Sequence, residues 1–520
     1  MTPHEAALAF LPAWTVPAAL LFWGAWSFVF SLVATRLVVT LPLRAFRRLR
    51  EAHWTEQARV AHPLRQALGA SLIAPVLMAG FEVGRAAGPF MRAPRVLLVL
   101  VVMAGSLTGW ALVARRVRKE MHRERLTGRA WLRDAMTGLL LVWPDVHWLA
   151  LLAPFIPPRM GLAAFAVLAI AVLGFGLLYW KSGLAILQLL GWARPASERL
   201  RAVFDRAAES MGIRPAGVWE VPWSVANAFA FPLRRDVAVS DGALRLLDDA
   251  GLATLAHHEL AHLEEPPRVR LARSFVWVLF LMMVAAPPVT GTWGLAGLAV
   301  LCALAWGLAL ALLAVSRRQE QTADAAARAG EDEAGREAAT LEKLYQAELI
   351  PVVQGSRLVR SHPDLWDRML AAGVQPSYPR PKPPRFRASL FLSIFAILLL
   401  WQLLTWTAGT AVLALLRGEE DRIAFKIGVL GDSMEGFYDL SILRMQQERF
   451  TESADFYRLS YELGVPHAEA AAALAEREVF AGRCKKATEA LEMARQLPEP
   501  PRGDEPWWTS ASQLVLSVCR

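Results

Sequence analysis

The sequence has only three cysteines among 520 residues, and its N-terminus lacks the features of a cleaved signal peptide. Residues 1–14 hold no basic cluster and no small-residue cleavage site before the first apolar run, so we expect an uncleaved membrane anchor. Cys302 falls within an apolar run and is predicted to be an apolar packing residue. Cys484 and Cys519 could form a disulfide in an oxidising compartment, but we favour Cys484 as a core residue of a helix.

The basic residues lack the interleaved aromatic or motif residues of a nucleic-acid-binding protein, although the formal net charge is +9. They gather instead in short segments beside apolar runs, at 44–50 and 115–125. Lys and Arg next to membrane spans mark the cytoplasmic side. We therefore predict no nucleic-acid partner, and we place both segments in the cytoplasm.

Long apolar runs are abundant. Hydrophobic residues make up 55% of the chain, and several runs approach the ~20 residues needed to cross a bilayer. The candidate spans are 16–36, 67–84, 96–114, 136–157, 160–190, 273–290, 292–315 and 389–416, of which the second and fourth are the weakest. The fold class that follows is a mainly α, polytopic membrane protein with about seven or eight spans in a lipid bilayer.

These runs divide the chain into four parts. They are an N-terminal membrane region (1–190), a soluble domain (191–388) interrupted by an apolar hairpin (273–315), a last span (389–416) and a helical tail (417–520). Alternating residues around "PLRRD" predict two short strands joined by a turn in the soluble domain. With eight spans the soluble domain lies in the cytoplasm and the tail lies outside, in the periplasm or beyond the cell; an error of one span would move the tail.

The tail contains a weak internal repeat with an offset of 34 residues. "ERFTESADFYRLSYELGVP" aligns with "GRCKKATEALEMARQLPEP", so that Ser453 matches Ala487 and Tyr457 matches Leu491. This pattern resembles the tetratricopeptide repeat, in which two helices pack through small residues. Such a tail implies a protein partner, and the alternative is an irregular helical tail.

The stretch "HHELAH" is the candidate for chemistry. His258 and His262 are four residues apart, so on a helix they lie on one face and can share a tetrahedral Zn²⁺. Glu259 is offset by one residue and lies beside the metal, where a general base belongs. His257 points away from the shared face and is interpreted as an outer-sphere or surface residue. A chance HExxH is expected in about one such chain in a hundred, so a third ligand is needed.

We predict that the third ligand is Glu320, in "SRRQEQTAD". An apolar hairpin that leaves the cytoplasmic face after His262 must return to that face just before this stretch. Asp324 lies on the same helix face as Glu320 and could accept the second N–H of a ligating histidine. The alternative for Glu320 is a solvated helix charge beside Arg317 and Arg318.

"HELAH", an apolar hairpin and "SRRQEQTAD" together resemble the membrane metallopeptidases that include the HtpX heat-shock protease and the type I CAAX prenyl proteases. The resemblance implies a gluzincin-like metallopeptidase domain with one Zn²⁺ per chain on two histidines and a glutamate. "ANAFAF" resembles a family strand that pairs with substrate backbone, which implies substrate contacts for Asn227, Ala228 and Phe229. "SHPDLWDRM" resembles the family's His-Pro motif and implies catalytic roles for His362 and Arg368.

The resemblance covers about 195–370, and "SHPD" and the extra N-terminal spans depart from the HtpX pattern. We predict an integral-membrane zinc metalloendopeptidase that cleaves peptides or membrane proteins at the cytoplasmic membrane face, in quality control or processing. Glu259 is the expected base, and His362 or Arg368 supports the oxyanion. The alternatives are a signalling zinc protease of the antibiotic-sensor kind, with the tail as an external sensor, and a non-catalytic membrane scaffold that uses the tetratricopeptide-like tail.

Overall fold

The computed structural model describes residues 10–86, 95–122, 127–142, 152, 155–157, 159–266, 269, 278–354, 363–384, 389–464, 467–497 and 509–519. The predicted catalytic residue His362 lies outside these residues. The chain divides into two compact units. One unit comprises 27–80 with 103–401, and the other comprises 1–26, 81–102 and 402–520.

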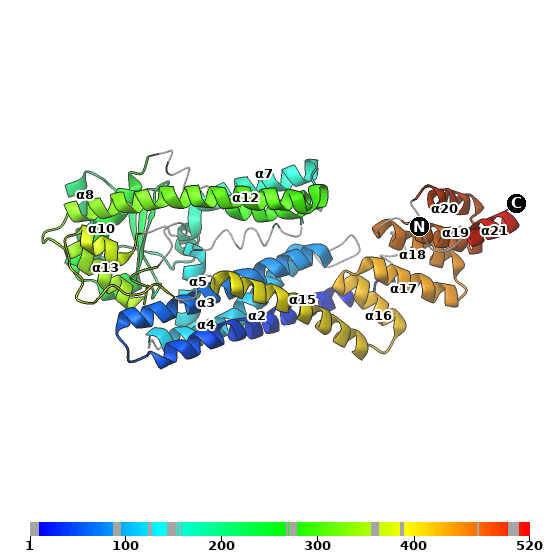
Figure 1. The fold of residues 1–520 in the computed structure, drawn as a ribbon, viewed down its shortest axis with the longest axis horizontal. Helices are drawn as coiled ribbons and strands as arrows, with labels where there is room; N and C mark the ends of the chain where they lie inside the picture. The colour runs from blue at the N-terminus through cyan, green and yellow to red at the C-terminus, as the bar shows by residue number, and fades with distance from the viewer. Residues whose placement is uncertain are drawn as a thin grey trace. The chain divides into compact units, whose positions relative to one another are not determined.

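The apolar runs form long helices (Figure 1). Four helices among the described residues are long and apolar enough to cross a membrane: α2 (Thr15–Arg48), α4 (Arg95–His122), α12 (Val278–Ala329) and α15 (Ser389–Leu415). Other predicted spans fall on α3 (Trp54–Ala86), α5 (Gly128–Val142) and α7 (Leu162–Leu189). The mainly helical fold class is confirmed, whereas the count of seven or eight spans stays a prediction.

The break in α12 occurs within the predicted apolar hairpin (273–315), at the end of the stretch "PPVTGTWG". Gly294 has φ 62° and ψ −154°, which interrupts the helical conformation between two apolar helical segments. Glycine adopts positive φ without the steric cost that a Cβ atom imposes. The segment after Gly294 runs past α7 and ends beside α10 (Asp249–Leu263) (Figure 1).

A four-stranded sheet supports one side of the soluble domain. Its order is β1 (Arg194–Pro195), β2 (Gly217–Val221), β4 (Asp236–Ser240) and β3 (Ala228–Phe231). β2 pairs with β4 in parallel, and β3 pairs with β4 in antiparallel orientation. The two strands predicted around "PLRRD" are β3 and β4. Within the described part of the chain, β3 is an edge strand.

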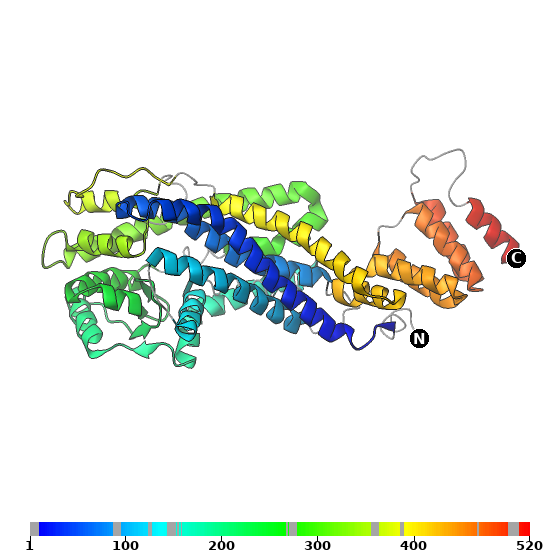
Figure 2. The ribbon, with the colours of Figure 1, turned by 90° about the horizontal axis from the view of Figure 1, so that it is seen from below.

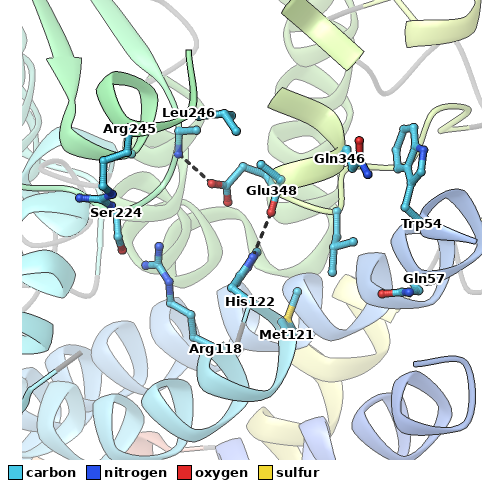
Figure 3. Close-up of a pocket in the computed structure, with 14 residues that line it drawn as sticks. Trp54, Gln57, Arg118, Met121, His122, Ser224, Arg245, Leu246, Gln346 and Glu348 are labelled. Carbon is cyan, nitrogen blue, oxygen red and sulfur yellow. Dashed lines mark hydrogen bonds between the residues drawn. The ribbon is translucent and has the colours of Figure 1, made fainter. Parts of the chain in front are cut away.

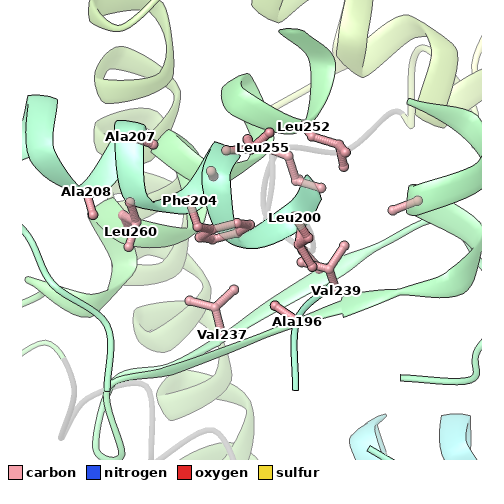
Figure 4. Packing of buried hydrophobic residues seen from close by; sticks show 14 of the residues in the cluster. Ala196, Leu200, Phe204, Ala207, Ala208, Val237, Val239, Leu252, Leu255 and Leu260 are labelled. Carbon is pink, nitrogen blue, oxygen red and sulfur yellow. The ribbon is translucent and has the colours of Figure 1, made fainter. Parts of the chain in front are cut away.

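A buried apolar core fixes α10 against this sheet (Figure 4). Side chains of α8 (Glu198–Met211), α10 and β4 meet there, among them Leu200, Phe204, Val237, Val239, Leu252 and Leu260. Burial of each large apolar side chain contributes about 1.5–3 kcal/mol. The core therefore holds the histidine-bearing helix in one position relative to the edge strand.

The tail consists of short helices in which consecutive members pack together (Figure 2). They are α16 (Glu419–Phe425), the π-helix η4 (Lys426–Leu430), α17 (Ser433–Gln446), α18 (Phe450–Leu463), α19 (Ala468–Phe480), α20 (Cys484–Gln496) and α21 (Thr509–Val518). The aligned repeat segments form α18 and α20, where the small residues Ser453 and Ala487 are both fully buried. The helical tail is present, and its assignment to the tetratricopeptide family stays a prediction.

The cysteines differ from the expectation. Cys484 stands at the start of α20 and is disulfide-bonded to Cys519, so the preference for an unpaired core residue is wrong. The bond joins the beginning of α20 to the end of α21. Cys302 is exposed on α12 rather than packed, because this part of α12 presents its apolar surface outward, where a bilayer would cover it.

Cys519→Ser should loosen the tail, because the disulfide cross-links residues 35 positions apart and restricts the unfolded chain. We expect a loss of about 2–4 kcal/mol, measured by faster hydrogen exchange of α20 and α21 in the intact protein. Cys302→Ser, which removes a thiol that forms no disulfide, is the control. If both tail cysteines are alkylated without prior reduction, the disulfide is absent.

Candidate metal centre

Three side chains from two helices converge at one point. α10 carries His258 and His262 on one face, and their Nε2 atoms lie 3.3 Å apart. α12 carries Glu320, whose carboxylate oxygens lie 3.6 Å from His258 Nε2 and 3.7 Å from His262 Nε2. The return of α12 to α10 therefore brings together the residues that the sequence predicted as metal ligands.

The spacing of these atoms fits a zinc ion. Zn–N bonds of about 2.0–2.1 Å in tetrahedral geometry place ligand atoms roughly 3.3–3.5 Å apart. The histidine nitrogens lie 3.3 Å apart, and each lies 3.6 or 3.7 Å from a different oxygen of Glu320. With one ligand atom taken from each residue, the three atoms lie within 4.8 Å of one another, close enough for a shared metal ion. Two imidazoles and one carboxylate are also a donor set of catalytic zinc sites, which keep a fourth position open.

The site is rich in buried negative charge. Glu259, Glu320 and Asp324 are 7%, 3% and 2% exposed, and buried carboxylates are costly without a compensating cation. Burial lowers the pKa of His258, but hydrogen bonds with Asp324 and Glu320 and the nearby negative charge outweigh this effect and raise that pKa to about 10. The surroundings thus favour a positive charge between the two histidines, as a divalent metal ion would provide.

Each of the two candidate ligand histidines has a carboxylate behind it. Asp324 Oδ1 lies 3.3 Å from His258 Nδ1, where the sequence placed it. Glu265 Oε1 lies 2.8 Å from His262 Nδ1 and is 4% exposed. Such carboxylates fix the tautomer and the ring orientation, so that both Nε2 atoms point toward Glu320. Sequence reasoning missed Glu265; the available signal was an acidic residue three positions after a ligand.

Arg368 lies in α14 (Leu365–Ala371) and is nearly completely buried. Its guanidinium donates to Asp324 Oδ1 and lies 3.8 Å from Glu337 Oε1. The arginine therefore contacts the carboxylate that holds His258, a geometry suited to positioning. Burial raises the pKa of the Glu337 carboxyl to about 7, and the neighbouring charge of Asp324 adds to this effect.

His257, which precedes the motif, has partners of its own. Its Nε2 lies 3.0 Å from the Ser210 hydroxyl, and its Nδ1 lies 2.8 Å from the Ala253 carbonyl oxygen. The ring is 6% exposed, so it is a packing residue between α8 and α10 rather than a surface residue.

A cavity of about 480 Å³ opens beside the cluster. His258, Glu259 and Glu320 line it together with Ala226 and Asn227, which directly precede β3. Of the predicted substrate-contacting residues, Asn227 thus faces the cavity. Ala228 and Phe229 lie in β3; Ala228 packs in the core, and the Phe229 ring stacks near Trp223 with centroids 5.6 Å apart.

Part of the chain is similar to known proteins. Residues 195–373 match peptidase family M48. Over 184 residues the chain is 32% identical to a protein named Protease HtpX homolog, from Acidiphilium cryptum (strain JF-5). That match covers 32% of this chain and 64% of the relative, so it spans a little under two thirds of the relative's length. No solved structure matches the chain.

The matched region contains the sheet, the HExxH helix, the second segment of α12 and Arg368. It leaves out the N-terminal helices and the tail. The predicted resemblance to HtpX-like enzymes is confirmed for this region: residues 195–373 match the M48 peptidase family, and the relative that is 32% identical is named a protease HtpX homolog.

Proposed function

We propose that the chain is an integral-membrane zinc metalloendopeptidase that hydrolyses peptide bonds at the cytoplasmic membrane face, in membrane-protein quality control or processing. The observation that carries this proposal is the convergence of His258, His262 and Glu320, whose ligand atoms lie within 4.8 Å of one another. Glu259, the base expected from the motif, lines the same cavity.

A zinc ion on these ligands would polarise the scissile carbonyl and acidify a water molecule. Glu259 then takes a proton from the attacking water and passes it to the leaving amine. Asp324 and Glu265 keep the two imidazoles oriented, and Arg368 acts through Asp324. His362 remains the predicted donor to the oxyanion.

The edge strand supports a mode of substrate binding. Main-chain groups of Asn227 face β4, because its carbonyl oxygen accepts the Ser240 N–H. Those of Ala228 therefore face away from β4, since orientation alternates along an antiparallel strand. A substrate segment adds there as a further strand beside Asn227, Ala228 and Phe229, and it can come from a peptide or from a membrane protein.

Features of the tail support a second candidate function, that of a signalling protease. A disulfide between Cys484 and Cys519 persists in an oxidising compartment, which supports the predicted external position of the tail. A cavity of about 520 Å³ between α17, α18 and α19, lined by Tyr438, Tyr457 and Arg477, would suit a protein partner. An external binding tail on a cytoplasmic protease is the arrangement of a signalling protease. The buried base and the three ligands argue against a non-catalytic scaffold.

Glu259→Gln should retain zinc and lower kcat by about 10²–10⁴-fold, because the amide cannot accept the proton from water. Cleavage of denatured casein by the purified full-length protein, followed by mass spectrometry, measures this effect. Glu264→Gln, an exposed substitution near the end of the same helix, is the matched control. Undiminished cleavage by Glu259→Gln would contradict the assignment of Glu259 as the general base.

Elemental analysis of the detergent-purified protein should find one zinc per chain, and Glu320→Ala should lose most of it. The reason is that two histidines alone leave the tetrahedral site with too few protein ligands. Asp332→Ala, at an exposed position, should keep its zinc. Full occupancy in Glu320→Ala would show that the third ligand is misassigned.

Glu265→Ala should weaken zinc binding by about 10–100-fold without abolishing it, because His262 loses the carboxylate that orients its ring. Competition with a chromogenic chelator measures the affinity, and Glu264→Ala serves as the control. Equal affinities for wild type and Glu265→Ala would mean that the contact with His262 does not act on the metal.

A further inference from the structure

A second cavity of about 530 Å³ lies next to the cleft, and helices from outside the matched region build part of it (Figure 3). Arg118 and His122 at the end of α4 and Trp54 at the start of α3 contribute one wall. Ser224 and Arg245 of the peptidase domain contribute another. The cavity is therefore a feature that the N-terminal region adds to this peptidase domain.

The two cavities meet at the beginning of the edge strand. Ala226 and Glu348 line both of them. The Ala226 N–H donates to Glu348 Oε1 over 2.7 Å. Because this N–H already donates to Glu348, it does not donate to a substrate. Backbone pairing with an added substrate strand therefore ends at Ala228. The substrate beyond Ala228 enters the second cavity.

The direction of the substrate follows from the sheet. β3 pairs with β4 in antiparallel orientation, and an antiparallel partner on its other edge gives the more stable ladder. A substrate antiparallel to β3 has its carboxyl-terminal side at the Ala226 end of the strand. The second cavity therefore receives the part of the substrate that follows the scissile bond.

Two arginines face this cavity (Figure 3). Arg118 Nη1 donates to Asp134 Oδ2 over 2.8 Å, and Asp134 also accepts the N–H and, over 2.6 Å, the hydroxyl of Ser224. This network fixes the Arg118 guanidinium relative to the peptidase domain. Arg245, in α9 (Asp241–Leu246), is exposed and brings a second guanidinium.

Negative charge at the cavity comes from Glu348. Its carboxylate is engaged by the Ala226 N–H, and Arg65 lies beside it, donating to the backbone carbonyls of Glu348 and Leu349. Among the residues that line the cavity, Arg118 and Arg245 carry positive charge and Glu348 carries negative charge, while Asp134, which does not line it, offsets part of the Arg118 charge. The planar fork of a guanidinium matches the geometry of a carboxylate.

We propose that Arg118 and Arg245 form a subsite that binds a substrate carboxylate on the carboxyl-terminal side of the scissile bond. The carboxylate is the chain end of the substrate or an acidic side chain. The inference rests on the proposed function for the identity of its ligand, but binding at the subsite does not require turnover.

The test uses the full-length, zinc-loaded Glu259→Gln protein and a dansylated octapeptide of alanine and leucine. The peptide is prepared with a free carboxyl end, as an amide, and as an amide with aspartate in the last position. Fluorescence anisotropy should show that the free acid binds about tenfold more tightly than the amide, as expected for a charge-assisted contact. Tight binding of the aspartate form would assign the site to any carboxylate, and weak binding would assign it to the chain end.

Arg245→Gln in the same background should abolish the difference between free acid and amide. It is the safer variant, because Arg118→Gln would also disturb the contacts of Asp134. Arg206→Gln, at an exposed position of α8, should keep the preference. Equal binding of all three peptides, or binding of none, would overturn the subsite.

The outcomes separate this subsite from the proposed function. If the protein with Glu259 intact cleaves no substrate while the carboxylate preference persists, the peptidase proposal fails and the subsite stands. If it cleaves substrates while the three peptides bind equally, the peptidase proposal stands and the subsite fails.

Discussion

The contact between α12 and α10 is the constraint on which the rest of the site depends. It places Glu320 and Asp324 against the face of the HExxH helix, more than fifty residues away along the chain. Buried carboxylates packed this closely repel one another and lose hydration, which favours positive charge among them. The contact that brings the three candidate ligands together therefore also favours the binding of a metal ion.

Residues behind the candidate ligands keep the two histidine rings in position. Asp324 contacts the His258 ring and accepts a hydrogen bond from Arg368. Glu265 contacts the His262 ring. The core beneath α10 keeps this helix at a fixed position relative to β3. Separate parts of the domain thereby position the candidate metal ligands, the candidate base and the edge strand, and each part has its own buried contacts.

The N-terminal region contributes more than membrane anchorage. Arg118 at the end of α4 contacts Asp134 of α5, and Asp134 binds Ser224 just before the edge strand. Helices outside the peptidase domain thus form one wall of a cavity that adjoins the cleft. These helices lie outside the residues that match the peptidase family.

The sequence by itself determined the long apolar helices and the meeting of His258, His262 and Glu320 as candidate metal ligands. Apolar run length, helical periodicity and the return of a hairpin are local or topological constraints. It also placed Asp324 and the two strands around "PLRRD". Only the tertiary structure decided the roles of Glu265, Arg368 and the Cys484–Cys519 bond. Each depends on which side chains meet after packing, which the sequence could only suggest: an acidic residue three positions after His262, a motif around Arg368 and two cysteines in one tail.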